Sequence, residues 1–170
     1  MNICPFCERN NHDDAGVCSH CGRGLSRLTG LSTLLIDDKT AMGGLSDRGS
    51  DRFAPNMSVL LRFREVRDLV TLPLVRETIL GRVSPSSASQ QPDIDLSYFK
   101  AYECGVSSRH VTLKRADQYL MLTDLGSTNG TYRNGERLLP YQSAIIHSGD
   151  EVRLGSLVMT FYFQETIPTH

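Results

Sequence analysis

The sequence predicts an all-β protein, with a β-sandwich that follows a small metal-bound segment and a linker. From Ser58 onward, apolar and polar residues alternate over short stretches, which is typical of half-buried strands. Clusters of Gly, Asn, Asp and Ser separate these stretches at intervals of about 8–12 residues, a spacing typical of sandwiches. No stretch carries the period of a long helix. The first 24 residues hold too few large apolar side chains for a core of their own.

The expected strands follow one another closely. Asn134-Gly135 is a strong signal for a two-residue hairpin turn, and Ala116–Gln118 marks a second turn. Ser84 to Pro92 is a loop rich in Ser, Gln and Pro. The strands are expected at 58–64, 78–80, 93–96, 111–115, 119–123, 131–133, 136–138, 151–154 and 157–163.

These patterns divide the chain into four parts. Residues 1–24 form the cysteine-containing segment and residues 25–57 a flexible linker of Gly, Ser, Thr and mixed charge. Residues 58–164 form the sandwich, and residues 165–170 a tail. The net charge is −1, and neither half is basic, which speaks against a general nucleic-acid binder.

Two Cys-x-x-Cys pairs near the N-terminus have the spacing of a metal site, formed by Cys4, Cys7, Cys18 and Cys21. Four thiolates complete a tetrahedral zinc site and leave no open position for catalysis. We therefore expect structural zinc in a small zinc ribbon. His12 or His20 could replace a ligand, but they read better as solvated loop residues. A redox function of the Cys-x-x-Cys pairs is less favoured, because no strand–helix pattern follows them in the sequence. Cys104 is expected to be a small, partly buried residue.

The chain holds no apolar run long enough to span a membrane and no secretory signal at its N-terminus. Cysteines arranged for metal rather than for disulfides suit a reducing compartment. The sequence therefore predicts a cytoplasmic protein.

Three polar clusters lie next to expected strands. Arg82 ends one strand, Ser107–Arg109 precede another, and Thr128–Gly130 form a turn. A guanidinium, hydroxyl groups and a side-chain amide are the groups that a phosphorylated peptide requires. Loops from separate strands can meet at one end of a sandwich. Each residue alone reads as an ordinary turn or surface residue, so the prediction depends on their joint order.

That order resembles the signature of the forkhead-associated (FHA) domain. The matching motifs are Gly81-Arg82, Ser107-x-x-His110, Ser127-Thr128-Asn129-Gly130-Thr131 and Asn134-Gly135, within residues 58–164. The resemblance implies an eleven-stranded β-sandwich whose loops bind phosphothreonine peptides. One departure is the spacing between Arg82 and Ser107, which are 24 residues apart and further apart than is usual in the family.

The resemblance also implies roles for single residues. Arg82 and Ser107 would contact the phosphate with help from Thr128, and Asn129 would bond to the peptide main chain. Ser108 stands where a backbone amide is often offered, and Arg109 could add charge. The residues expected to be architectural are Gly81, His110, Gly130 and Gly135.

The expected function is an adaptor or regulator in Ser/Thr kinase signalling, of the kind found in small bacterial FHA proteins. An enzyme is disfavoured, because no nucleophile–base pair emerges. The alternative is a nucleic-acid-binding or scaffold protein with a zinc ribbon, regulated through its FHA domain. Partners would be a phosphothreonine protein or a Ser/Thr kinase, and possible phosphorylation sites in the linker are Thr29, Thr33 and Thr40. In this family, a phosphorylated N-terminal threonine can occupy the protein's own pocket. We favour a plain spacer.

Overall fold

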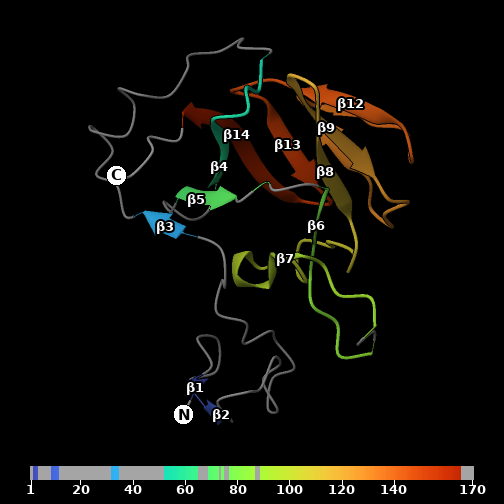
Figure 1. Cartoon of the computed structure of the whole chain (residues 1–170). Coiled ribbons are helices and arrows are strands. Elements are labelled where there is room, and N and C mark those ends of the chain that lie inside the picture. The colour runs from blue at the N-terminus through green and yellow to red at the C-terminus, as the bar shows by residue number, and fades with distance from the viewer. Residues whose placement is uncertain are drawn as a thin grey trace.

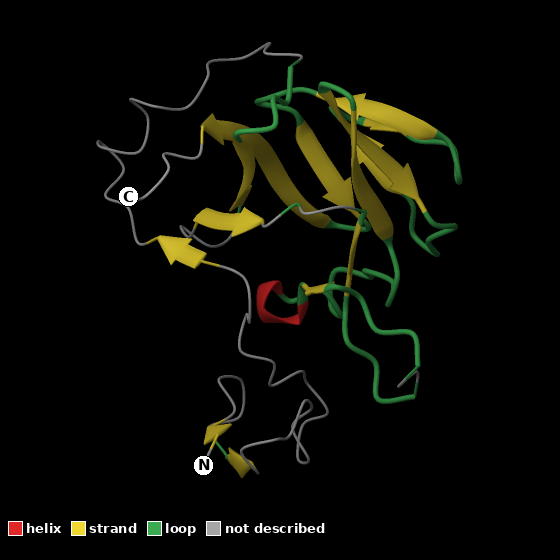
Figure 2. Ribbon diagram, in the orientation of Figure 1, coloured by secondary structure: helices red, strands yellow, loops and turns green. Residues whose placement is uncertain are grey.

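The computed structural model shows two facing β-sheets (Figure 1). The structure describes residues 2–3, 9–11, 32–34, 52–64, 69–72, 74, 77–86 and 89–165. Within these ranges the only helix is the 3₁₀ turn η2 (Ser97–Phe99), drawn in red in Figure 2. The prediction of an all-β sandwich is therefore confirmed. No helix of the described part is long and apolar enough to cross a membrane.

The larger sheet has seven strands in the order β11-β10-β13-β14-β4-β5-β3. Its central pair is β14 with β4, which align antiparallel along the full length of β4. The strand bounds are β3 (Ser32–Leu34), β4 (Met57–Phe63), β5 (Leu69–Leu72), β10 (Thr131–Arg133), β11 (Glu136–Arg137), β13 (Glu151–Leu154) and β14 (Leu157–Glu165).

The smaller sheet has five strands in the order β12-β9-β8-β6-β7. The pair β6–β7 is parallel and the other pairs are antiparallel. This parallel pairing sets the two ends of the long Ser84–Pro92 loop side by side, and Asp95 Oδ1 accepts the Val83 N–H at 3.0 Å. The bounds are β6 (Thr78–Gly81), β7 (Ile94–Asp95), β8 (Val111–Ala116), β9 (Tyr119–Asp124) and β12 (Ser143–Ile146).

The core fills the space between the sheets. Alternate residues of β14, among them Met159, Phe161 and Phe163, are fully or almost fully buried, as the alternation of the sequence predicts. The Phe63 ring stacks on Phe99 with centroids 3.7 Å apart, so η2 is held against the core. Phe53 is also buried completely and packs against Phe163.

The N-terminal boundaries differ from those expected. Phe53 and β3 lie within the predicted linker, residues 25–57, yet both belong to the sandwich. The described residues form seven and five strands in the two sheets, so a count of eleven is not confirmed. In the predicted zinc ribbon, β1 (Asn2–Ile3) pairs with β2 (Asn10–Asn11). The predicted ligands Cys4, Cys7, Cys18 and Cys21 lie outside the described residues, as do Thr29 and Thr40.

Candidate functional site

Three loops meet at one end of the five-stranded sheet: the end of β6, the segment before β8, and the β9–β10 connection. The Arg82 N–H donates to the Ser107 carbonyl at 3.3 Å, and the Leu125 N–H donates to the His110 carbonyl at 3.0 Å. These backbone bonds join the loops pairwise. The structure therefore brings together the loops that sequence analysis selected.

Arg82 is held from two sides. Its Nε donates to the Val106 carbonyl at 2.7 Å, and its Cζ lies 5.0 Å from the centroid of the Tyr102 ring. Its Nη atoms make no hydrogen bond to any residue within the described ranges. A guanidinium fixed at Nε and stacked on a ring keeps its terminal N–H groups ready for an anion.

Tyr102 is a site residue that sequence analysis missed. It is 71% exposed, so its ring is available for a contact at the surface. Its contact with Arg82 provides one, and a cation–π contact at an exposed site contributes about 0.5–1 kcal/mol. No motif marks this residue, because the contact depends on the fold of the loop before β8.

Ser107, Thr128 and Asn129 form a chain of polar contacts across two loops. The Ser107 Oγ accepts the Thr128 N–H at 3.2 Å, which leaves the hydroxyl proton of Ser107 available to donate. Asn129 Nδ2 donates to the Gly105 carbonyl at 2.9 Å, which fixes its side chain beside the same loop. None of the described residues donates to the amide oxygen of Asn129, so this oxygen can accept from a donor outside them.

Gly81 permits the closest approach between the loops. A Cβ placed on Gly81 would lie 2.0 Å from the carbonyl oxygen of Ser108, far inside van der Waals contact. Only glycine fits at this position without moving the Ser107–Arg109 loop. Ser108 is half-buried there, and Arg109 is exposed.

His110 connects two of the three loops from below. The side chain is completely buried, its Nδ1 accepts the Ser107 N–H at 3.0 Å, and its Nε2 lies 3.1 Å from the Gly130 carbonyl. Since Nδ1 is an acceptor, the ring proton sits on Nε2 and is donated to Gly130. Burial lowers the pKa of His110, and the bond to Gly130 and the charge of Asp124 offset this only in part. The ring is therefore neutral and positions both loops.

Asp124 is a second residue that sequence analysis missed. Its carboxylate is buried at the end of β9 and accepts from Gly126 N, Ser127 N, Ser127 Oγ and Thr131 Oγ1 at 2.8, 2.9, 2.5 and 2.5 Å. Burial alone would raise the pKa of Asp124, but these hydrogen bonds outweigh it and lower the pKa. Asp124 therefore shapes the whole turn that carries Thr128 and Asn129.

The two remaining glycines lie at turns with positive φ. Gly130 has φ of 82° and Gly135 has φ of 84°. Asn134, with φ of 50°, completes a two-residue turn in which Arg133 pairs with Glu136, so the predicted hairpin is confirmed.

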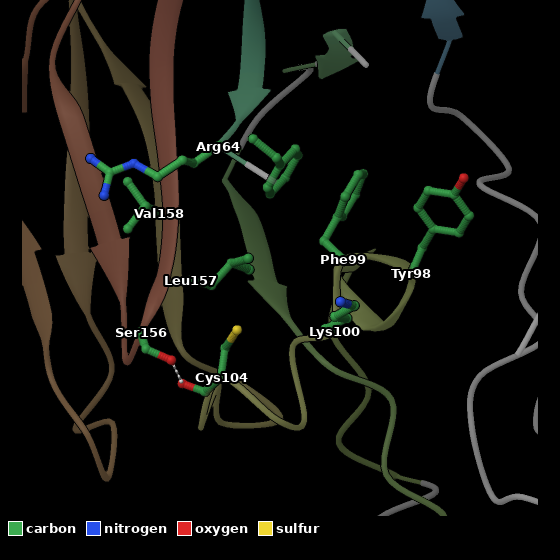
Figure 3. Close-up of a pocket in the computed structure, with 9 residues that line it drawn as sticks. Arg64, Tyr98, Phe99, Lys100, Cys104, Ser156, Leu157 and Val158 are labelled. Atoms are coloured by element: carbon green, nitrogen blue, oxygen red, sulfur yellow. Dashed lines mark hydrogen bonds between the residues drawn. The ribbon is translucent and has the colours of Figure 1, made fainter. Parts of the chain in front are cut away.

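A cavity of about 180 Å³ lies beside η2, and Arg82 is not among the residues that line it. Figure 3 shows Phe99 and Leu157 on its walls and the Cys104 sulfur pointing inward. Lys100 and Arg64 also line it. Cys104 is a free, half-buried thiol that packs against the core, as the sequence predicts. Its carbonyl accepts from Ser156, which joins the cavity wall to the turn after β13.

Comparison with known proteins identifies the domain. Residues 78–155 match the family model of the FHA domain. The chain is 36% identical over 76 residues to the oxoglutarate dehydrogenase inhibitor of Corynebacterium diphtheriae, covering 45% of this chain and 49% of that protein. It is equally similar, at 36% over 76 residues, to the glycogen accumulation regulator GarA of Mycobacterium tuberculosis, covering 45% of this chain and 43% of GarA. The chain thus spans about half the length of these relatives or less.

The fold agrees with this match. The solution structure of an FHA domain from Arabidopsis thaliana superposes with a TM-score of 0.51 at 22% identity, covering 74% of this chain and 98% of that one. At this identity the likeness concerns the fold alone. Residues 78–155, which include the three loops around Arg82, therefore match the FHA domain in sequence, and the sandwich has the fold of an FHA domain.

Proposed function

We propose that this protein is a phosphothreonine-peptide-binding adaptor or regulator in Ser/Thr kinase signalling. The observation that carries the proposal is the state of Arg82, whose Nε is bonded to the Val106 carbonyl and whose Nη groups bond to none of the described residues. A fixed guanidinium with two open NH2 groups is suited to bidentate pairing with a phosphate.

The neighbouring groups would supply the remaining contacts of a phosphate site. The Ser107 hydroxyl would donate to a second phosphate oxygen, since its lone pair already accepts from Thr128. The Thr128 hydroxyl, the Ser108 amide and the exposed Arg109 would add further donors. Asn129 would bond to the peptide main chain through its amide oxygen, while its Nδ2 remains on Gly105.

The geometry does not favour an enzyme. Ser107 and His110 are three residues apart and could suggest a nucleophile and its base. However, both ring nitrogens of His110 are engaged, one by the Ser107 amide and the other by the Gly130 carbonyl. The ring therefore has no free nitrogen to take a proton from the Ser107 hydroxyl. A screen for turnover of phosphopeptides and esters is expected to be negative.

The N-terminal cysteines would hold one structural zinc ion through Cys4, Cys7, Cys18 and Cys21. We expect one zinc ion per chain by elemental analysis. Because metal binding is coupled to folding in such small segments, a chelator should change the NMR signals of residues 1–24 and leave those of the sandwich in place. Binding to nucleic acid that falls steeply with salt would instead support the alternative role of this segment.

The central test is a titration with phosphothreonine peptides and their unphosphorylated twins, followed by fluorescence anisotropy. Phosphate-dependent binding is expected, and Arg82→Ala should weaken it at least about tenfold, since a hydrogen bond between charged groups contributes about 1.5–3 kcal/mol. Lys114→Ala removes one exposed positive charge on β8 and serves as the matched control. Equal binding of both peptide forms by phosphatase-treated protein would contradict the proposal.

A further inference from the structure

Three side chains form a row on the outer face of the larger sheet, next to the loop of Asn129. Tyr132 on β10 stands opposite Arg137 on β11 and opposite Arg153 on β13. Directly opposed residues of antiparallel strands project on the same face. The next residue back along β10, Thr131, is fully buried, so this row faces outward. We call Arg137, Tyr132 and Arg153 the arginine row.

The two guanidinium groups lie over one aromatic ring. The Cζ of Arg153 is 3.8 Å from the centroid of Tyr132, and the Cζ of Arg137 is 6.0 Å from it. Stacking on a ring uses the flat face of a guanidinium and leaves its N–H edge open. Arg153 is therefore held close against the ring, and Arg137 lies at the outer limit of such a contact.

The arginine row is continuous with the candidate phosphate site. A Cβ placed on Gly130 would lie 3.0 Å from the Nε of Arg137, so this side chain touches the residue that follows Asn129. Arg153 Nη1 donates to the Gly155 carbonyl at 3.0 Å, and the Gly155 N–H donates to the Gly130 carbonyl at 3.0 Å. Both arginines thus border the turn that presents Asn129.

The charge of the row is not compensated within the part of the chain that the structure describes. Neither Arg137 nor Arg153 forms an ion pair there. The nearest acidic residue on the same strand face, Glu151, is paired with Arg64 at 3.0 Å. Glu136 neighbours Arg137 in sequence, but alternation turns it to the other face of the sheet. Two cations therefore remain open to a negative group from outside.

We propose that the arginine row is a subsite for the carboxylate of an aspartate or glutamate in the same peptide that places its phosphothreonine at Arg82. This inference rests on the proposed function, because Asn129 orients the peptide that would reach the row. A carboxylate matches the row in charge, and the planar guanidinium fork matches it in shape. The row would thus select acidic residues on one side of the phosphothreonine.

The test is a set of phosphothreonine peptides with one neutral core sequence. A single glutamate is moved one position at a time along both flanks, and each peptide has a glutamine twin. Affinities are measured by anisotropy for the wild type, for Arg137→Gln and for the control Lys114→Gln. Arg137 is exposed on a two-residue strand, so its substitution should leave the fold intact, which thermal unfolding checks. The Arg82→Ala variant reports separately on the phosphate.

At one offset, or two adjacent ones, glutamate is expected to bind about three- to tenfold tighter than glutamine, as a charge-assisted surface contact provides. In Arg137→Gln this preference should fall below about twofold, while Lys114→Gln should keep it. Higher salt should reduce the preference in the wild type and in Lys114→Gln, and should change little in Arg137→Gln.

Three outcomes would contradict the inference. If glutamate confers no gain at any offset while neutral peptides bind in a phosphate- and Arg82-dependent way, the arginine row is not a subsite and the proposed function stands. The same conclusion holds if the gain survives in Arg137→Gln. If no phosphothreonine peptide binds at all, both the proposed function and the subsite are refuted.

Discussion

Replacement of Asp124 should reveal how much the three loops around Arg82 depend on one buried carboxylate. In Asp124→Ala the rigid amides of Gly126 and Ser127 would lose their acceptor, whereas the two hydroxyls can rotate toward other partners. Hydrogen bonds to a charged group contribute about 1.5–3 kcal/mol each, so the two amides alone imply a loss of about 3–6 kcal/mol in the free energy of unfolding. Asp124→Asn keeps an oxygen for the amides, so a loss of about 1–2 kcal/mol is expected.

The assay is urea unfolding followed by circular dichroism, with phosphopeptide titration in parallel. The lowered pKa of Asp124 adds a pH signature. The unfolded chain takes up this proton near pH 3.8 and the folded chain only at lower pH, so the stabilisation is complete above pH 3.8 and is lost as the pH falls below it. The difference in the free energy of unfolding between the wild type and Asp124→Asn should therefore become smaller at acidic pH.

Asp117→Asn is the matched control, because it removes one carboxylate from an exposed turn at φ of 52°, which asparagine tolerates. This control should change the free energy of unfolding by no more than about 0.5 kcal/mol. A loss below about 1 kcal/mol in Asp124→Ala would refute the view that this carboxylate holds the turn. If the difference in the free energy of unfolding between the wild type and Asp124→Asn does not change with pH, the negative charge of Asp124 does not stabilise the turn.

Three further predictions concern neighbouring residues. Tyr102→Ala should weaken phosphopeptide binding about two- to fivefold and Tyr102→Phe should not, because the contact with Arg82 uses the ring; equal effects in a titration would contradict this. Gly81→Ala should displace the loop at Ser108 and abolish binding, with NMR shifts centred there; an unchanged spectrum would contradict the close approach. Since burial lowers the pKa of His110 below 6.5, stability should fall as the pH drops below 6.5, and His110→Gln should lack this slope in urea unfolding.

The parts of the fold that depend on local sequence could be predicted. The alternation along Leu157–Phe163 and the turn at Asn134-Gly135 are local signals, and the structure has a strand and a hairpin at these places. The order of Arg82, Ser107 and Asn129 was equally informative, because three loops at one end of a sandwich converge whatever the length of the insertions between them. The long Ser84–Pro92 loop did not prevent this, since β6 and β7 pair at its base.

The supporting residues could not be predicted, because their partners lie on other strands or loops. In the sequence, Asp124 looks like an ordinary polar residue at the end of a strand. Its role becomes visible only in the structure, where the turn from Gly126 to Thr131 folds back over its carboxylate. In the sequence, Tyr102 looks like an ordinary loop tyrosine. Its contact with Arg82, which is distant in sequence, is visible only in the structure. The arginine row depends on the register of three strands, which no single segment of the sequence specifies.

The position of Thr33 bears on whether the chain could occupy its own phosphate site. Thr33 lies in β3, where it stands opposite Val70 at the edge of the larger sheet. Figure 1 shows this edge apart from the end of β6, where Arg82 lies. If phosphorylated Thr33 were bound at Arg82, its main chain would have to lie beside Asn129. Thr33 cannot be there while it pairs with Val70 of β5, so the two positions exclude each other. Binding of Thr33 to the chain's own site therefore requires that the β3–β5 pairing be broken. A phosphorylated threonine of another protein can bind without this loss of free energy.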